Sequence, residues 1–124
     1  MKTIIHVDNS EFFRKLVKTF LGEHGFEVES FDNAEEALGQ VSAGQVGLII
    51  TGLSFSDMDG NEFIKRIIGY PYIIPIIALT SSQSPQIEYE ARRLGVKGWI
   101  HKSSAWQEQL LPLVRQYLGP DPAV

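Results

Sequence analysis

The sequence contains no cysteine, so disulfides, thiolate metal sites and cysteine nucleophiles are excluded, as is common in reducing compartments. It also lacks long apolar runs. The longest mostly apolar segment, YIIPIIAL from Tyr72, is far short of the ~20 residues that cross a bilayer. The apolar stretch before Asp8 is too short for the core of a signal peptide. We therefore expect a cytoplasmic protein without a membrane partner.

Positive charge is scarce as well. The chain has 11 Lys and Arg against 15 Asp and Glu, a formal net charge of −4, which is not the basic surplus of a direct nucleic-acid binder. The three histidines, His6, His24 and His101, have no metal-ligand spacing. A length of 124 residues with 44% hydrophobic residues is typical of one globular domain.

Short apolar runs alternate with segments of helical periodicity. Strands are expected at 3–7, 26–31, 46–51, 73–80 and 98–101. The runs at 46–51 and 73–80 are almost continuously apolar, which is typical of strands covered on both faces. Five β-then-α units predict an α/β fold, a doubly wound five-stranded parallel sheet with helices on both faces. We expect residues 1–118 to form the domain and 119–124 a frayed tail or linker.

Two helices have clear end signals. Ser10 can cap the first helix and Gly25 lies where it should end, while Ser84 and Pro85 are a good start for the fourth, which Gly95 follows. The apolar residues expected to face inward on the first and third helices are Phe12, Phe13, Leu16, Val17, Phe20, Leu21, Phe63, Ile64, Ile67 and Ile68.

The second and fifth helices begin with possible capping boxes. Asp32 with Glu35 has this pattern before the second helix, and Ser104 with Gln107 has it before the fifth. Pro112 inside the last helix should remove one backbone hydrogen bond and bend it.

Polar residues stand just after the predicted strands. In parallel sheets of this kind, ligands bind at the carboxyl ends of the strands. The residues that follow the first, third, fourth and fifth strands there are Asp8, Asn9, Gly52, Thr80, Ser81 and Lys102. We expect this group to form the functional site.

These motifs resemble a known family. The segments IIHVDNS, SFSDMDG, IIALTSS and GWIHKSS, in this order, are similar to the strand-end motifs of receiver domains in bacterial two-component response regulators, and the resemblance covers the whole chain. It implies a flavodoxin-like strand order, 2-1-3-4-5, like that of chemotaxis regulators. In this family an aspartate takes a phosphoryl group from a histidine kinase, with Mg²⁺ bound by carboxylates.

The resemblance assigns roles by position. Asp8 and Asn9 match the acidic pair that holds the metal, and Gly52 falls on the phosphoryl acceptor. The phosphate pocket would comprise Thr80, Ser81 and Lys102, and the switch would comprise Thr80 and Trp99. Glycine has neither a nucleophile nor a metal ligand, so we expect no catalytic residue and weak or no Mg²⁺ binding at Asp8.

Several functions remain open. The chain is either a phosphorylation-independent pseudo-receiver that acts by protein–protein interaction, or an ordinary phospho-accepting receiver. The latter requires Gly52 to be an introduced or variant change, or another acceptor such as Asp57 or Asp59, whose side chains we expect to bond their own turns. A flavodoxin-like mononucleotide binder would share the fold, but no Gly-rich phosphate loop follows the first strand. We expect no enzyme activity.

The resemblance also implies a protein-binding face on the fourth helix, fifth strand and fifth helix. Its residues here would be Arg92, Arg93, Lys97, Trp99, Glu108 and Arg115. Lys97 stands where regulators of this family often have an acidic residue used in dimer pairing, so the chain is expected to be a monomer or a weak dimer. The partner would be a signalling protein, or a histidine kinase if the domain accepts phosphate.

Lys102 would normally face a carboxylate at position 52. A partly buried ammonium without a counter-ion is costly, and Asp8 is the only carboxylate that the motif places within reach. We therefore predict an ion pair between Asp8 and Lys102 that holds the pocket in one arrangement.

Overall fold

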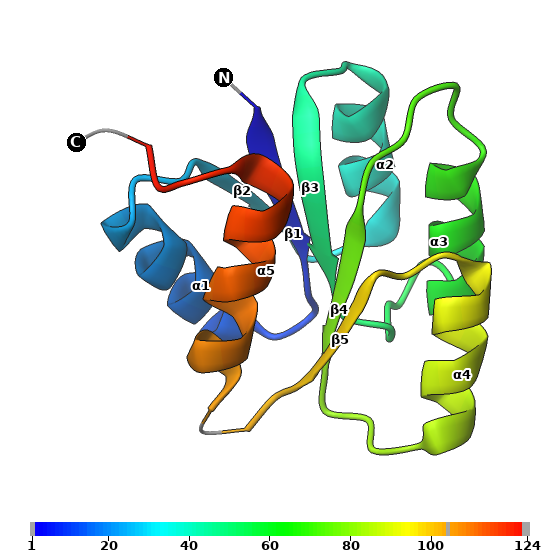
Figure 1. Cartoon of the computed structure of the whole chain (residues 1–124). Helices are drawn as coiled ribbons and strands as arrows, with labels where there is room; N and C mark the ends of the chain where they lie inside the picture. The colour runs from blue at the N-terminus through cyan, green and yellow to red at the C-terminus, as the bar shows by residue number, and fades with distance from the viewer. Residues whose placement is uncertain (1, 104, 123–124) are drawn as a thin grey trace.

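A computed structural model describes residues 2–103 and 105–122, in which five strands alternate with five helices (Figure 1). The strands are β1 (Thr3–Val7), β2 (Val28–Phe31), β3 (Val46–Thr51), β4 (Ile76–Thr80) and β5 (Gly98–His101). The helices are α1 (Glu11–Glu23), α2 (Ala34–Ser42), α3 (Gly60–Ile68), α4 (Pro85–Leu94) and α5 (Trp106–Leu118). All strand pairs are parallel, in the order β2-β1-β3-β4-β5, which confirms the predicted fold.

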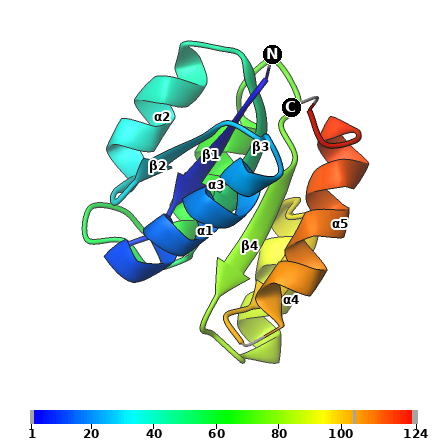
Figure 2. The ribbon, with the colours of Figure 1, turned by 90° about the vertical axis from the view of Figure 1, so that its left-hand side faces the viewer.

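Helices cover both faces of the sheet. Figures 1 and 2 show α1 and α5 on one face and α2, α3 and α4 on the other. Successive residues of β3 pack on opposite faces of the sheet. Ile50 packs in the core under α1 and α5, whereas Ile49 packs in the core under α2, α3 and α4. Every residue of β3 is buried, as its continuous apolar run predicted.

The predicted ends of α1 and α4 are confirmed. The Ser10 hydroxyl accepts a hydrogen bond from the Phe13 N–H at 3.2 Å, and the Ser84 hydroxyl accepts one from the Ile87 N–H at 3.3 Å. Gly25 and Gly95 follow the two helices with φ of +87° and +123°, a backbone region that favours glycine. The first and fourth strands therefore lead into helices whose starts are fixed.

Some boundaries differ from the prediction. The side chain that caps α2 is Asn33, which accepts from the Glu36 N–H at 2.9 Å, so the capping box from Asp32 was wrong. β2 begins at Val28 rather than 26. β4 begins at Ile76, because Pro75 has no N–H to give to a ladder.

Three apolar side chains that the sequence predicts to lie in the core or in a strand are exposed. Phe12 is 68% exposed and Ile68 is 51% exposed, so their predicted inward positions were wrong. Ile73, which we had placed in the fourth strand, is 94% exposed. Each lies at the end of a helix or in a loop, where periodicity no longer fixes the direction of a side chain.

The start of α5 has no side-chain cap at Ala105, and the predicted cap Ser104 lies outside the described residues. Pro112 lies within α5 on its exposed side. In the tail beyond Leu118, Asp121 accepts hydrogen bonds from Arg115 Nε and Nη2 at 2.7 and 3.0 Å, and His24 Nδ1 lies 2.9 Å from the same carboxylate.

None of the helices in the described part of the chain combines the length and the apolar character that a bilayer span requires.

Candidate functional site

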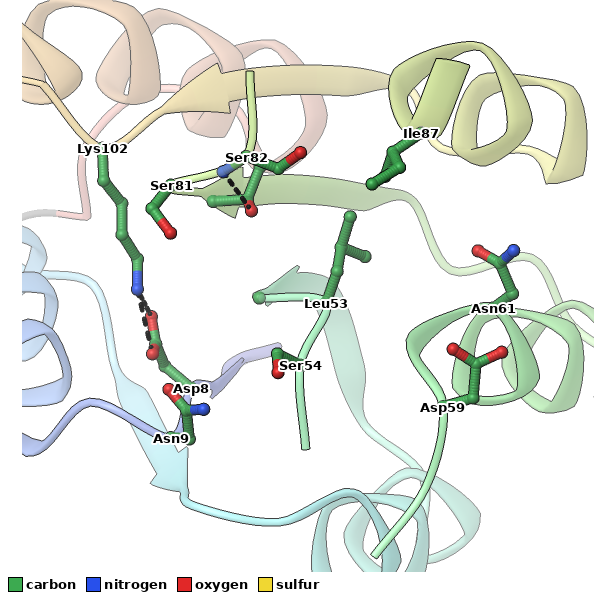
Figure 3. A pocket seen from close by; sticks show the side chains of 12 residues that line it. Asp8, Asn9, Leu53, Ser54, Asp59, Asn61, Ser81, Ser82, Ile87 and Lys102 are labelled. Atoms are coloured by element: carbon green, nitrogen blue, oxygen red, sulfur yellow. Dashed lines mark hydrogen bonds and ion pairs between the residues drawn. The ribbon is translucent and has the colours of Figure 1, made fainter. Parts of the chain in front are cut away.

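A pocket of about 470 Å³ lies at the carboxyl ends of the strands (Figure 3). Its lining comprises Asp8, Asn9, Gly52, Leu53, Ser54, Asp59, Asn61, Thr80, Ser81, Ser82, Ile87 and Lys102. All six strand-end residues singled out from the sequence are present. The topology brings them together because β1, β3 and β4 are neighbours whose carboxyl ends meet at one edge.

Asp8 and Lys102 form an ion pair on one wall of this pocket. Lys102 Nζ lies 2.8 Å from Oδ2 of Asp8 and donates a hydrogen bond to Oδ1 at 3.1 Å. The two side chains point toward one another in Figure 3. Asp8 is 1% exposed and Lys102 13%, so solvent screens the pair poorly. The predicted contact is therefore confirmed.

Further contacts fix Asp8. Its Oδ1 also accepts from the Ser10 N–H at 2.9 Å, and its backbone carbonyl accepts from Arg14 at 2.7 Å. Burial raises the pKa of the Asp8 carboxyl, but His6, Lys102 and the Ser10 N–H outweigh burial and bring this pKa below its ordinary value. Asp8 is thus a carboxylate at neutral pH.

His6 lies beneath this pair and was not recognised as a neighbour of the site. It is 0% exposed, and its Nε2 lies 3.7 Å from Oδ2 of Asp8, longer than a hydrogen bond. Burial lowers the pKa of His6 despite the nearby carboxylate, so the ring is neutral at neutral pH. The signal was available, because side chains two positions apart along an extended chain point to the same face, and Asp8 follows β1 directly.

An aromatic ring supports Lys102 from the α1 side. The ammonium lies 4.5 Å from the centroid of Phe13, a cation–π distance. Phe13 in turn packs against Trp106 of α5, with ring centroids 5.9 Å apart. Lys102 is therefore held between a carboxylate and an aromatic cluster.

Gly52 directly follows β3 and lines the pocket. Its N–H donates to the Val7 carbonyl at 2.8 Å, and its own carbonyl accepts from the Thr51 hydroxyl at 2.6 Å. A Cβ at this position would lie 3.8 Å from both Asp8 Cγ and the Val7 carbonyl oxygen, which are ordinary contact distances. The backbone is thus fixed, and a Cβ would be accommodated.

The loop after β4 is tied to its surroundings. Thr80 Oγ1 accepts from the Ser82 N–H at 3.1 Å, so the Thr80 hydroxyl holds its own loop. His101 Nε2 lies 3.1 Å from the Ser81 carbonyl and 3.3 Å from the Gln83 amide nitrogen. The partly buried His101 therefore holds the loop after β4 in place.

The two aspartates of the β3–α3 loop behave differently. Asp57 accepts from the backbone N–H groups of Ala34 and Glu35 at 3.1 and 2.9 Å, so it caps α2 and its predicted bonds to its own turn were wrong. The Glu35 N–H is the main cause of a lowered pKa at Asp57. Asp59 lines the pocket and makes no side-chain cap bond to α3, within the described residues.

The residues present do not fit the Mg²⁺ site that the resemblance implies. Both oxygens of Asp8 face the Lys102 ammonium, Gly52 offers no ligand and Asn9 is neutral. Across residues 2–103 and 105–122, no three His, Cys, Asp or Glu side chains gather closely enough to hold a metal. Lys102 supplies the positive charge beside Asp8 instead.

Five pocket residues were missed from the sequence: Leu53, Ser54, Asn61, Ser82 and Ile87. Leu53, Ser54 and Ser82 follow the strand ends by one or two positions, so a wider window would have included them. Asn61 and Ile87 belong to the first turns of α3 and α4, and no local pattern showed which helix starts face the pocket.

Two residues of the expected protein-binding face pair with other residues of the chain. Arg92 pairs with Glu88 at 2.9 Å, and Arg115 is held by the tail residue Asp121. Trp99 is partly buried against the core beneath α4, which matches a core residue as well as a switch.

Comparisons with known proteins agree on one family. The family model described as the response regulator receiver domain matches residues 4–115. Chemotaxis protein CheY4 of Vibrio cholerae is 31% identical with a TM-score of 0.82, over 95% of this chain and 99% of that chain. A two-component response regulator from Clostridium difficile is 26% identical with a TM-score of 0.87, over 95% and 96%.

Curated relatives are longer. The two-component response regulator PhoP of Pseudomonas aeruginosa is 29% identical over 122 residues, 96% of this chain and 54% of that protein. The C4-dicarboxylate transport transcriptional regulatory protein DctD of Rhizobium meliloti is 28% identical over 103 residues, 83% of this chain and 22% of that protein. The chain thus spans about half or less of the length of these relatives. With its sheet order, its strand-end pocket and the matched family model, the chain belongs to the response regulator receiver domains of two-component signalling.

Proposed function

We propose that this receiver domain acts through protein–protein contact and does not accept a phosphoryl group. The observation that carries the proposal is the ion pair of Asp8 and Lys102 beside Gly52. Phosphoryl transfer in this pocket would need a carboxylate nucleophile and a metal that offsets charge. Gly52 provides no nucleophile, and Lys102 already neutralises the carboxylate that would bind the metal.

The same pair supports a single pocket arrangement. Lys102 is held by Asp8 and Phe13, and the Thr80 hydroxyl is engaged by the Ser82 N–H. A phosphoryl group would normally compete for Lys102 and Thr80 and so shift the domain between two states. Without it, the face formed by α4, β5 and α5 keeps one conformation for a signalling partner.

The competing function is phospho-acceptance at another residue. Asp57 is unsuited, because its two oxygens accept from the start of α2. Asp59 is the alternative acceptor that the geometry favours, because its carboxylate lines the pocket and is exposed. The same chemistry at position 52 would return if the residue there were aspartate.

Incubation with acetyl phosphate and Mg²⁺, followed by intact mass spectrometry, separates these functions. We expect no acid-labile phosphate adduct on the chain. The variant Gly52→Asp is the positive control. A stoichiometric adduct on the unmodified chain would disprove the proposal, and its loss in Asp59→Asn would assign the acceptor.

A further inference from the structure

The pocket beside Gly52 has the size of a small-molecule site. Its volume of about 470 Å³ lies within the ~300–1,000 Å³ that ligand pockets usually span. Asn61 and Ile87 also line an adjoining hollow of about 390 Å³, with Ser84, Gln86 and Glu90. The two hollows therefore share lining residues from the starts of α3 and α4.

One side of the pocket is apolar. Leu53 and Ile87 face each other across this side in Figure 3, opposite the Asp8 and Lys102 pair. Ile87 is an apolar side chain that is 45% exposed. It belongs to a well-capped helix, in which a polar residue would be tolerated at this position. An apolar surface of this kind is suited to the flat or aliphatic part of a ligand.

The remaining lining is mostly uncharged and able to form hydrogen bonds. It includes the hydroxyls or amides of Asn9, Ser54, Asn61, Thr80, Ser81 and Ser82. Hydroxyls and amides both donate and accept, so they match ligand hydroxyls, amides and ring nitrogens.

The charges in the pocket do not favour an ion. Asp8 and Lys102 cancel each other at 2.8 Å, and Asp59 is exposed to screening solvent. An anion would lose hydration and face two carboxylates, while Lys102 is already engaged. A cation would find Asp8 already neutralised.

We infer that this pocket binds a small uncharged molecule with several hydrogen-bonding groups and an apolar part, of which a nucleoside is an example. The inference rests on the proposed function, because a pocket that took up a phosphoryl group and Mg²⁺ would bind anions instead. Such a ligand would contact Leu53 and Ile87. Its binding would be the signal received by a domain that is not phosphorylated.

The test uses adenosine and thymidine as uncharged probes, each compared with its 5′-monophosphate and with inorganic phosphate. Amide and methyl chemical shifts of the labelled chain are followed during titration, without Mg²⁺. We expect saturable shifts at Leu53, Asn61 and Ile87 with at least one nucleoside, and at least tenfold weaker binding of its monophosphate.

Matched variants locate the site. Ile87→Gln should weaken nucleoside binding at least fivefold, whereas Tyr89→Gln should leave it unchanged, since Tyr89 is 64% exposed on the same helix and does not line the pocket. The absence of pocket shifts with both nucleosides would overturn the inference, as would a monophosphate or inorganic phosphate that binds as tightly. A phosphate adduct in the mass experiment would instead overturn the proposed function, so the two failures are distinguishable.

Discussion

Lys102 Nζ lies 2.8 Å from Oδ2 of Asp8, although the two residues are 94 positions apart in the chain. The contact joins the end of β1 to the residue after β5, across the pocket that Gly52 leaves open. An internal ammonium thus neutralises Asp8 from within the chain. The consequences can be measured without knowing the partner.

Removing one member of this pair should strand the other. We expect Asp8→Ala to lower the free energy of unfolding by more than the ~0 to 1 kcal/mol of exposed pairs, toward the ~3 to 5 kcal/mol of buried ones. Lys102→Met should cost less, because its stem can still pack on Phe13. Urea melts of both single variants and the double variant measure the coupling. Additive losses, with a coupling below ~0.5 kcal/mol, would mean that the pair does not hold the pocket.

Gly52→Asp should restore a metal site. A new Cβ would lie 3.8 Å from Asp8 Cγ and from the Val7 carbonyl oxygen, so it meets no clash, and the variant adds a second carboxylate beside the first. We expect Mg²⁺ to bind the unmodified chain in the millimolar range or more weakly, and the variant roughly tenfold or more tightly. Titrations followed by amide shifts give both constants, with Gly52→Asn as a control of similar size. Micromolar Mg²⁺ binding by the unmodified chain would show that the ligand analysis is wrong.

Buried His6 should make stability depend on pH. Burial lowers the pKa of His6 in the folded state below its ordinary value of 6.5. Below pH 6.5 the unfolded chain therefore binds a proton at His6 more readily than the folded chain does. Stability should therefore fall as the pH drops below 6.5, by up to about 1.4 kcal/mol per pH unit for this one proton. Urea melts of the unmodified chain and His6→Gln between pH 5 and 8 isolate it from His24 and His101. Parallel curves for the two proteins would contradict the prediction.

Asp57 should stabilise α2 from a distance. Its carboxylate accepts from the Ala34 and Glu35 N–H groups, and these bonds lower its pKa. A depressed pKa contributes stability that is present above pH 3.8 and is lost as the pH falls below that value. Asp57→Ala should speed amide hydrogen exchange at Ala34 and Glu35 at neutral pH, while Ser56→Ala in the same loop should not. Equal protection in both variants would mean that the cap is not formed in solution.

Local signals in the sequence were reliable where a single segment decides the structure. Ser10 and Ser84 cap the helices that they were expected to cap, and the apolar run of β3 is buried on both faces. The residues that follow the strands lie close together because the carboxyl ends of parallel strands meet at one edge of the sheet. The ion pair could be predicted because the family motif left Lys102 with only one carboxylate.

Contacts between distant segments could not be predicted in this way. Asp57 reaches N–H groups 22 and 23 positions upstream, and nothing near Asp57 indicates this. Asp121 likewise contacts Arg115 of α5 and His24, which follows α1. The direction of Ile87 toward the pocket depends on how α4 packs, which periodicity does not determine.

The ties around the pocket also bear on what this domain can communicate. Asp57 binds the β3–α3 loop to the start of α2. Hydrogen bonds of Ser82 and His101 hold the loop after β4, and Lys102 is paired with Asp8. A partner can shift a protein only between conformations that it binds with different affinity. A receiver confined to one conformation in this way would report its own abundance, so the rates of its synthesis and degradation would carry the signal.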